Sequence, residues 1–160
     1  ESESRGLGDV YKRQHKEALK NVNIALALRP SYADALGVKA TALLGLKMPL
    51  EALQSLEKAR KLNPNFSIEY LSIEVIAHLM MEEWSKAKEI ATLALQRLPE
   101  HEPSLVMVIM ADVALGNMED ALWNLEELLI LNPDFKFQTW QFGDFKFLTK
   151  IALQLSLIHI

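Results

Sequence analysis

Small and branched apolar residues recur along the chain in four segments that share one internal spacing and each end at a proline. Three such residues follow one another at steps of four and three, and the proline comes five residues later. The members are Ala18, Val22 and Ala25 before Pro30; Ala52, Leu56 and Ala59 before Pro64; Ala87, Ala91 and Ala94 before Pro99; and Ala121, Leu125 and Leu128 before Pro133. Steps of three and four place residues on one face of a helix, and proline disfavours helix in the residue before it. The pattern predicts four helices that bury this face and end near the proline.

The period of the pattern indicates a repeat protein. The four prolines are 34, 35 and 34 residues apart, and a fixed period of this size is typical of stacked helical hairpins. The segments resemble the tetratricopeptide repeat (TPR) family. This resemblance implies an all-α fold, namely a right-handed superhelical solenoid of antiparallel helix hairpins. Half a repeat is expected at 15–31 and full repeats at 32–66, 67–101 and 102–134. An ordinary helical bundle with evenly spaced prolines is the alternative.

Three features depart from the family's pattern. The family favours a small residue midway along the inner helix, which Ala40 fits and Val75 and Ile109 do not. The family often has glycine in the turn of the hairpin, which Gly116 fits, whereas the equivalent residues of the other two hairpins are Lys47 and Glu82. Leu128 replaces the last alanine, which predicts a wider gap after the final hairpin. The departures indicate a divergent member.

The two ends of the chain can be encoded by the two strands of one short DNA sequence. The codons GAT GTG TAT AAG AGA CAG encode residues 9–14, and their reverse complement encodes residues 155–160. This word resembles a transposon-end adapter used in sequencing libraries. We interpret residues 1–14 and 155–160 as adapter-derived and expect the authentic segment to be residues 15–154. A flexible N-terminal arm and a hydrophobic C-terminal tail are the alternative.

The segment 135–154 is rich in aromatic residues, which are Phe135, Phe137, Trp140, Phe142, Phe145 and Phe147. A helix is expected from Asp144, a suitable N-cap, through Leu148, Ile151 and Ala152. Because the last repeat of a solenoid has no neighbour to cover its apolar face, we predict a capping segment and capping helix here. An aromatic ligand platform is the alternative. The segment also loosely resembles the region that closes TPR tails on bacterial class III nucleotide cyclases.

Composition narrows the range of partners. The chain has 17 basic and 21 acidic residues, a net charge of −4 and no cysteine. Without a cluster of basic residues there is no electrostatic footprint for nucleic acid. The absence of cysteine excludes disulfides and thiolate metal sites, and no uncharged stretch reaches the roughly 18 residues of a membrane span. We expect no nucleic-acid or membrane partner and a cytoplasmic location.

No arrangement of residues predicts catalysis. The chain has no glycine-rich phosphate loop, and neither His78 nor His101 has the spacing of a metal ligand. Pairs of carboxylates such as Glu82–Glu83 and Glu126–Glu127 are typical of solvated helix faces. We therefore predict a protein that is not an enzyme and uses no cofactor and no metal.

The resemblance places ligand binding on the concave face that the inner helices line. The predicted groove residues are Asp34, Thr41, Leu44, Glu69, Ser72, Ile76, Leu79, Met80, Val106, Met110 and Val113. Methionine and branched residues at this spacing suit a partner peptide or amphipathic helix, although the same residues could instead contact the rest of the protein. The lysine and asparagine clamp with which some members grip a C-terminal carboxylate is not present at the matching places, which hold Gly37, Thr41, Ser72, Ile76, Val106 and Met110.

The predicted function is a protein–protein interaction module with a partner peptide or helix in its groove. The alternative is the C-terminal regulatory or scaffolding TPR region of a larger enzyme, such as a bacterial class III adenylate or guanylate cyclase. The apolar end of the groove also leaves a homodimer open.

Overall fold

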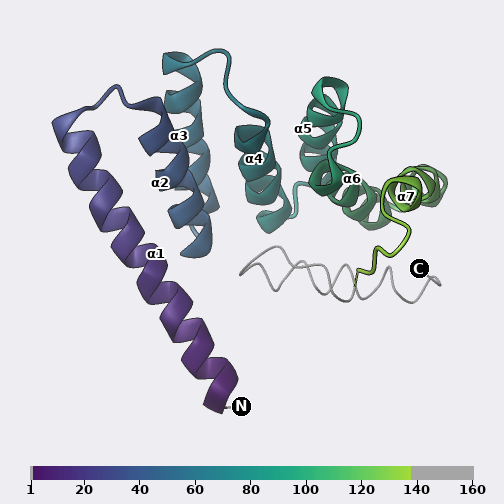
Figure 1. Ribbon diagram of the computed structural model, residues 1–160, viewed down its shortest axis with the longest axis horizontal. Helices are drawn as coiled ribbons and strands as arrows, with labels where there is room; N and C mark the ends of the chain where they lie inside the picture. The colour runs from purple at the N-terminus through teal and green to yellow at the C-terminus, as the bar shows by residue number, and fades with distance from the viewer. Residues whose placement is uncertain (1, 138–160) are drawn as a thin grey trace. The chain divides into compact units, whose positions relative to one another are not determined.

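The structure, a computed structural model, describes residues 2–137, which form seven α-helices and no strand (Figure 1). The helices are α1 (Ser2–Leu28), α2 (Ala33–Gly45), α3 (Pro49–Leu62), α4 (Ile68–Met80), α5 (Trp84–Arg97), α6 (Glu102–Leu115) and α7 (Met118–Leu131). The expectation of an all-α fold is confirmed for this part of the chain. The aromatic segment after residue 137, with its expected capping helix, and residues 155–160 lie outside the described residues.

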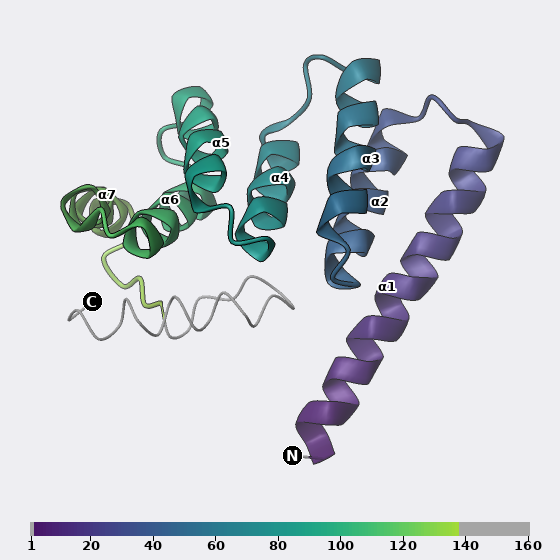
Figure 2. The same ribbon diagram turned by 180° about the vertical axis from the view of Figure 1, so that it is seen from behind.

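The chain divides into two compact units, residues 1–77 and 78–160, with the division inside α4. In the first unit, α2 packs against both α1 and α3 (Figure 2). Among its described residues, the second unit has α6 packed against both α5 and α7. The packing agrees with pairs of adjacent helices joined by short turns.

The small-residue face that the sequence predicts is buried in the helices α3, α5 and α7. The exposed fraction is 0% for Ala52, Ala59, Ala87, Ala91, Ala94 and Leu128, and at most 7% for Leu56, Ala121 and Leu125. A small side chain at these positions allows two helix backbones to approach closely, so the periodic alanines are contact positions between helices. Ala40, Val75 and Ile109 are equally buried, which shows that the larger residues of the second and third inner helices are accommodated in the core.

The helix α1 is longer than the half repeat expected from the sequence, because it begins at Ser2. All side chains from residue 5 to residue 14 are exposed, whereas Val22 is buried. The part of α1 that packs in the first unit is therefore its C-terminal half.

The helices α2, α4 and α6 each end in the same hydrogen-bonded turn. The residues with left-handed backbone are Lys47 (φ 60°), Glu82 (φ 58°) and Gly116 (φ 78°). The amide of the next residue donates to the carbonyl five positions earlier, as Met48 to Leu43 (2.9 Å), Glu83 to His78 (2.9 Å) and Asn117 to Asp112 (2.8 Å). This is the Schellman arrangement, which satisfies carbonyls at a helix end and favours glycine at the left-handed position. The turn that the sequence aligns at these three places is the same turn in the structure.

Introducing glycine into one of these turns and removing it from another should have opposite effects on stability. Replacing Lys47 or Glu82 with glycine should raise the free energy of unfolding by about 0.5–1 kcal/mol, because a side chain strains the left-handed conformation. Replacing Gly116 with alanine should lower it by about 1 kcal/mol, since open space surrounds Gly116 and only the backbone is strained. Urea unfolding followed by circular dichroism measures all three. Equal effects of Lys47→Gly and Lys47→Ala would contradict this explanation.

A set of ion pairs around the buried carboxylate of Asp112 joins α5, α6 and α7. Lys88 of α5 contacts the fully buried carboxylate of Asp112 of α6 (2.6 Å) and the carboxylate of Asp120 of α7 (2.9 Å). Asn117 also donates to Oδ1 of Asp112 (3.2 Å). The helix α6 is buried on all sides from residue 104 to residue 112, so the contacts with Lys88 and Asn117 compensate the loss of water around the Asp112 carboxylate.

Candidate functional site

The structure places the predicted groove residues on the inner helices α2, α4 and α6, with very different accessibility. Asp34, Thr41 and Glu69 are exposed, and Ser72, Ile76, Met80 and Val113 are half-buried. In contrast, Leu44, Leu79, Val106 and Met110 have exposed fractions of 0–1%. These four residues belong to the hydrophobic core, where they contribute to stability and offer no surface to a partner. The expectation that they line an open groove is therefore corrected.

The accessible predicted residues of the first unit form two stripes, which we call the α2–α4 face. Asp34, Val38 and Thr41 follow one another at steps of four and three on α2, and Glu69, Ser72 and Ile76 follow at steps of three and four on α4. Residues at these steps share one side of a helix. Sequence reasoning missed Val38, although it lies in the same stripe as Asp34 and is 54% exposed.

Tyr70 joins the two helices of this face. Its hydroxyl donates to the carbonyl oxygen of Ala33 (3.1 Å) and lies 3.2 Å from a carboxylate oxygen of Asp34. Its ring lies directly over Gly37, where a Cβ atom would approach the ring to 2.7 Å. Only glycine at position 37 allows this contact, so the pair of residues fixes α2 against α4.

Tyr70 also contacts Phe66, which lies in the loop after α3. The Tyr70 ring is stacked with Phe66 at a centroid distance of 6.2 Å, and the guanidinium of Arg60 lies 4.6 Å from the Phe66 centroid. Arg60 also forms an ion pair with Glu74 of α4. Partial burial and the hydrogen bond to Asp34 raise the pKa of the Tyr70 phenol above its usual range, so the hydroxyl stays protonated at neutral pH. These side-chain contacts connect α4 to α2 and to α3.

The two hydroxyl groups of the α2–α4 face direct their protons into their own helices. Thr41 donates to the carbonyl of Gly37 (3.2 Å) and Ser72 donates to that of Ile68 (3.3 Å). Each hydroxyl oxygen keeps lone pairs that accept hydrogen bonds, and the Asp34 carboxylate is an acceptor as well. The polar groups of the face thus favour a ligand that supplies hydrogen-bond donors.

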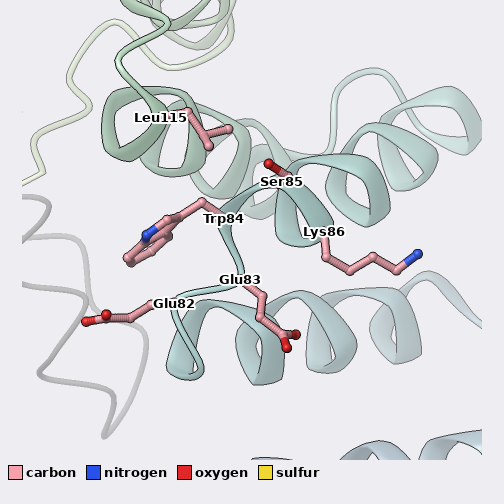
Figure 3. A pocket seen from close by; sticks show the side chains of 6 residues that line it. All are labelled: Glu82, Glu83, Trp84, Ser85, Lys86 and Leu115. Carbon is pink, nitrogen blue, oxygen red and sulfur yellow. The ribbon is translucent and has the colours of Figure 1, made fainter.

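A hollow of about 570 Å³ lies in the second unit, at the turn between α4 and α5 (Figure 3). Its lining residues are Glu82, Glu83, Trp84, Ser85, Lys86 and Leu115. Glu83 is paired with Nδ1 of His78 (2.5 Å), and Lys86 is paired with Glu89 (3.0 Å). In Figure 3 the side chains of Trp84 and Glu82 point to the same side of the turn. A carboxylate beside an indole suits a cationic side chain.

The two histidines considered in the sequence have side-chain partners within the protein. His78 contacts Glu83, and Nδ1 of His101 lies 2.7 Å from the hydroxyl of Ser104. Between residues 2 and 137, no three histidine or carboxylate side chains gather in a way that would hold a metal ion. In the same part of the chain, no helix combines the length and the apolar character that crossing a membrane requires.

The described structure thus defines the class of the protein as all-helical, with helix pairs packed around alanine-rich contact positions. No family model matches the chain, and no curated protein sequence matches it.

Proposed function

We propose that this chain is a TPR-like helical-repeat module that binds a partner protein through the α2–α4 face. The observation that carries the proposal is the pair of accessible stripes on α2 and α4, held together by the hydrogen bonds of Tyr70 to Ala33 and Asp34. Support for the repeat comes from the period of the prolines, the buried alanines and the three equivalent Schellman turns. The hydrogen bonds of Tyr70 hold the start of α2 beside α4 before a partner binds, which reduces the entropy lost on binding.

The chemistry of the face indicates the kind of peptide. Val38 and Ile76 offer apolar area, and their neighbours Asp34, Thr41 and Ser72 offer acceptors. A suitable ligand combines an aliphatic or aromatic side chain with a lysine or arginine. A ligand that binds through a C-terminal carboxylate is disfavoured, because these acceptors would repel it.

Selection from a phage-displayed library of random peptides on the full chain tests the proposal. We expect enrichment of peptides that combine apolar and basic residues. Val38→Lys should weaken their binding at least tenfold, because it removes apolar contact area and adds a charge of the same sign as the ligand. Lysine is a good helix former and Val38 is exposed, so this variant should fold normally.

The matched control is Leu50→Lys, since Leu50 is 63% exposed on α3 and lies outside the α2–α4 face. It should change the affinity of the same peptides less than twofold. Enrichment of acidic peptides, or equal affinity for the Val38→Lys variant and the unmodified chain, would show that the face is not the binding site.

A further inference from the structure

The outer surface of α7 differs from the equivalent surfaces of α3 and α5. Trp123 and Ile130 have exposed fractions of 66% and 73%. The periodic sequence aligns Trp123 with Gln54 and Glu89, and it aligns Ile130 with Lys61 and Gln96, all of which are polar and exposed. At both positions, α3 and α5 therefore have a polar residue and α7 has an apolar residue.

The charge of α7 differs in the same way. The helix α3 carries three basic and two acidic residues, and α5 carries three basic and one acidic residue. The helix α7 carries four acidic residues and no basic residue. Of these four, Asp120 is paired with Lys88, whereas Glu119, Glu126 and Glu127 are exposed. Glu126 and Glu127 are three and four residues from both Trp123 and Ile130, so the acidic groups lie between the two apolar side chains on the same side of α7.

From this combination we infer that α7 is a docking site for a basic amphipathic helix of another protein. We call its surface the α7 stripe, made of Trp123, Glu126, Glu127 and Ile130. Trp123 and Ile130 are seven residues apart, two helical turns and about 10 Å along the axis. A partner helix with apolar residues at the same spacing would meet both. Lysine or arginine residues beside them would meet the carboxylates, and this charge complementarity favours a basic protein helix over an anionic surface.

This inference does not depend on the proposed function of the α2–α4 face. The α7 stripe is in the second unit and the α2–α4 face belongs to α2 and α4, so different variants test them. Trp123 also supplies a direct signal, because the fluorescence of an exposed indole shifts to shorter wavelength when a partner covers it.

The test uses the full chain and two synthetic peptides of about 14 residues, which matches the length of α7. One peptide has leucines at three-and-four spacing with lysine elsewhere, and the other has glutamate in place of lysine. We expect the leucine–lysine peptide to bind with a blue shift of tryptophan emission. Its affinity should fall as salt is raised, since exposed charges are screened. The leucine–glutamate peptide should bind at least tenfold more weakly.

The double variant Trp123→Gln/Ile130→Gln gives α7 the residue types found at the same positions of α3 and α5. It should lose at least tenfold in affinity for the leucine–lysine peptide with an unchanged circular dichroism spectrum. Glu127→Lys, which copies Lys58 of α3, should weaken binding by a smaller factor. Leu50→Gln is the matched control for an exposed apolar residue elsewhere and should have no effect.

Three results would overturn the inference. They are equal binding of both peptides, unchanged affinity of the double variant, and self-association of the chain that the double variant abolishes. The last result would show that the α7 stripe is a contact between copies of this chain.

Discussion

Replacing Ala87 with arginine is expected to unfold the helix packing of the second unit. Ala87 is fully buried on α5, where a neighbouring helix leaves no space for a long side chain. The variant must either bury an unpaired charge or separate the helices, and each costs on the order of 3–5 kcal/mol. This is a large part of the roughly 5–15 kcal/mol that stabilises a typical domain. Urea unfolding followed by circular dichroism should show a much lower midpoint or no folded baseline.

The matched control for Ala87→Arg is Thr92→Arg on the same helix. Thr92 is exposed, so its arginine stays in water and the free energy of unfolding should change by less than about 0.5 kcal/mol. If both variants were equally stable, the alanine positions would not be helix contacts, and the interpretation of the repeat would fail with them.

Replacing Lys88 with leucine is expected to destabilise the protein by about 3 kcal/mol. Lys88 pairs with Oδ1 of Asp112, whose carboxylate is fully buried. Within residues 2–137, the other oxygen, Oδ2, accepts no hydrogen bond. Removal of the lysine leaves an uncompensated buried charge. Urea unfolding of the variant and of the unmodified chain at neutral pH measures the effect.

The double variant Lys88→Leu/Asp112→Leu should recover most of this loss. The repeat pattern aligns Lys88 with Leu53 and Asp112 with Leu43, so leucine already occupies the equivalent positions of the first complete hairpin. Replacing both members of a buried ion pair by apolar residues is often neutral or stabilising. A double variant that is no more stable than Lys88→Leu would show that packing, and not charge, explains the effect.

The contribution of Lys88 should also depend on pH with a definite sign. The hydrogen bond to Asp112 is the main cause that raises the pKa of Lys88, and burial opposes it. A group whose pKa is raised in the folded state stabilises fully below its unfolded pKa, about 10.4 for lysine. The difference in unfolding free energy between the unmodified chain and Lys88→Leu should therefore be constant from about pH 7 to 9. It should shrink as the pH rises above about 10.4.

The positions of the helices could be predicted from the sequence to within a few residues. The helices expected to end near a proline are α1, α3, α5 and α7, which end at Leu28, Leu62, Arg97 and Leu131, because helical period and proline act locally and leave a regular pattern. The buried alanine positions and the equivalence of the three turns at Lys47, Glu82 and Gly116 could be predicted for the same reason. Of the candidate site, Asp34, Thr41, Glu69, Ser72 and Ile76 are accessible as the groove prediction required.

The residues that share a side of a helix can be assigned from the sequence, since this assignment depends only on the period of the chain. Which of those sides a neighbouring element covers depends on how the helices pack. Leu79, Val106 and Met110 have the spacing of groove residues and are buried, whereas Trp123 and Ile130 are exposed although no sequence pattern places them in a binding surface. The contact of Tyr70 with Gly37 and the ion pair of Lys88 with Asp112 each join two helices, and no local pattern encodes such a pair. Burial and charge pairing are properties of the space between helices, which exists only after they have packed.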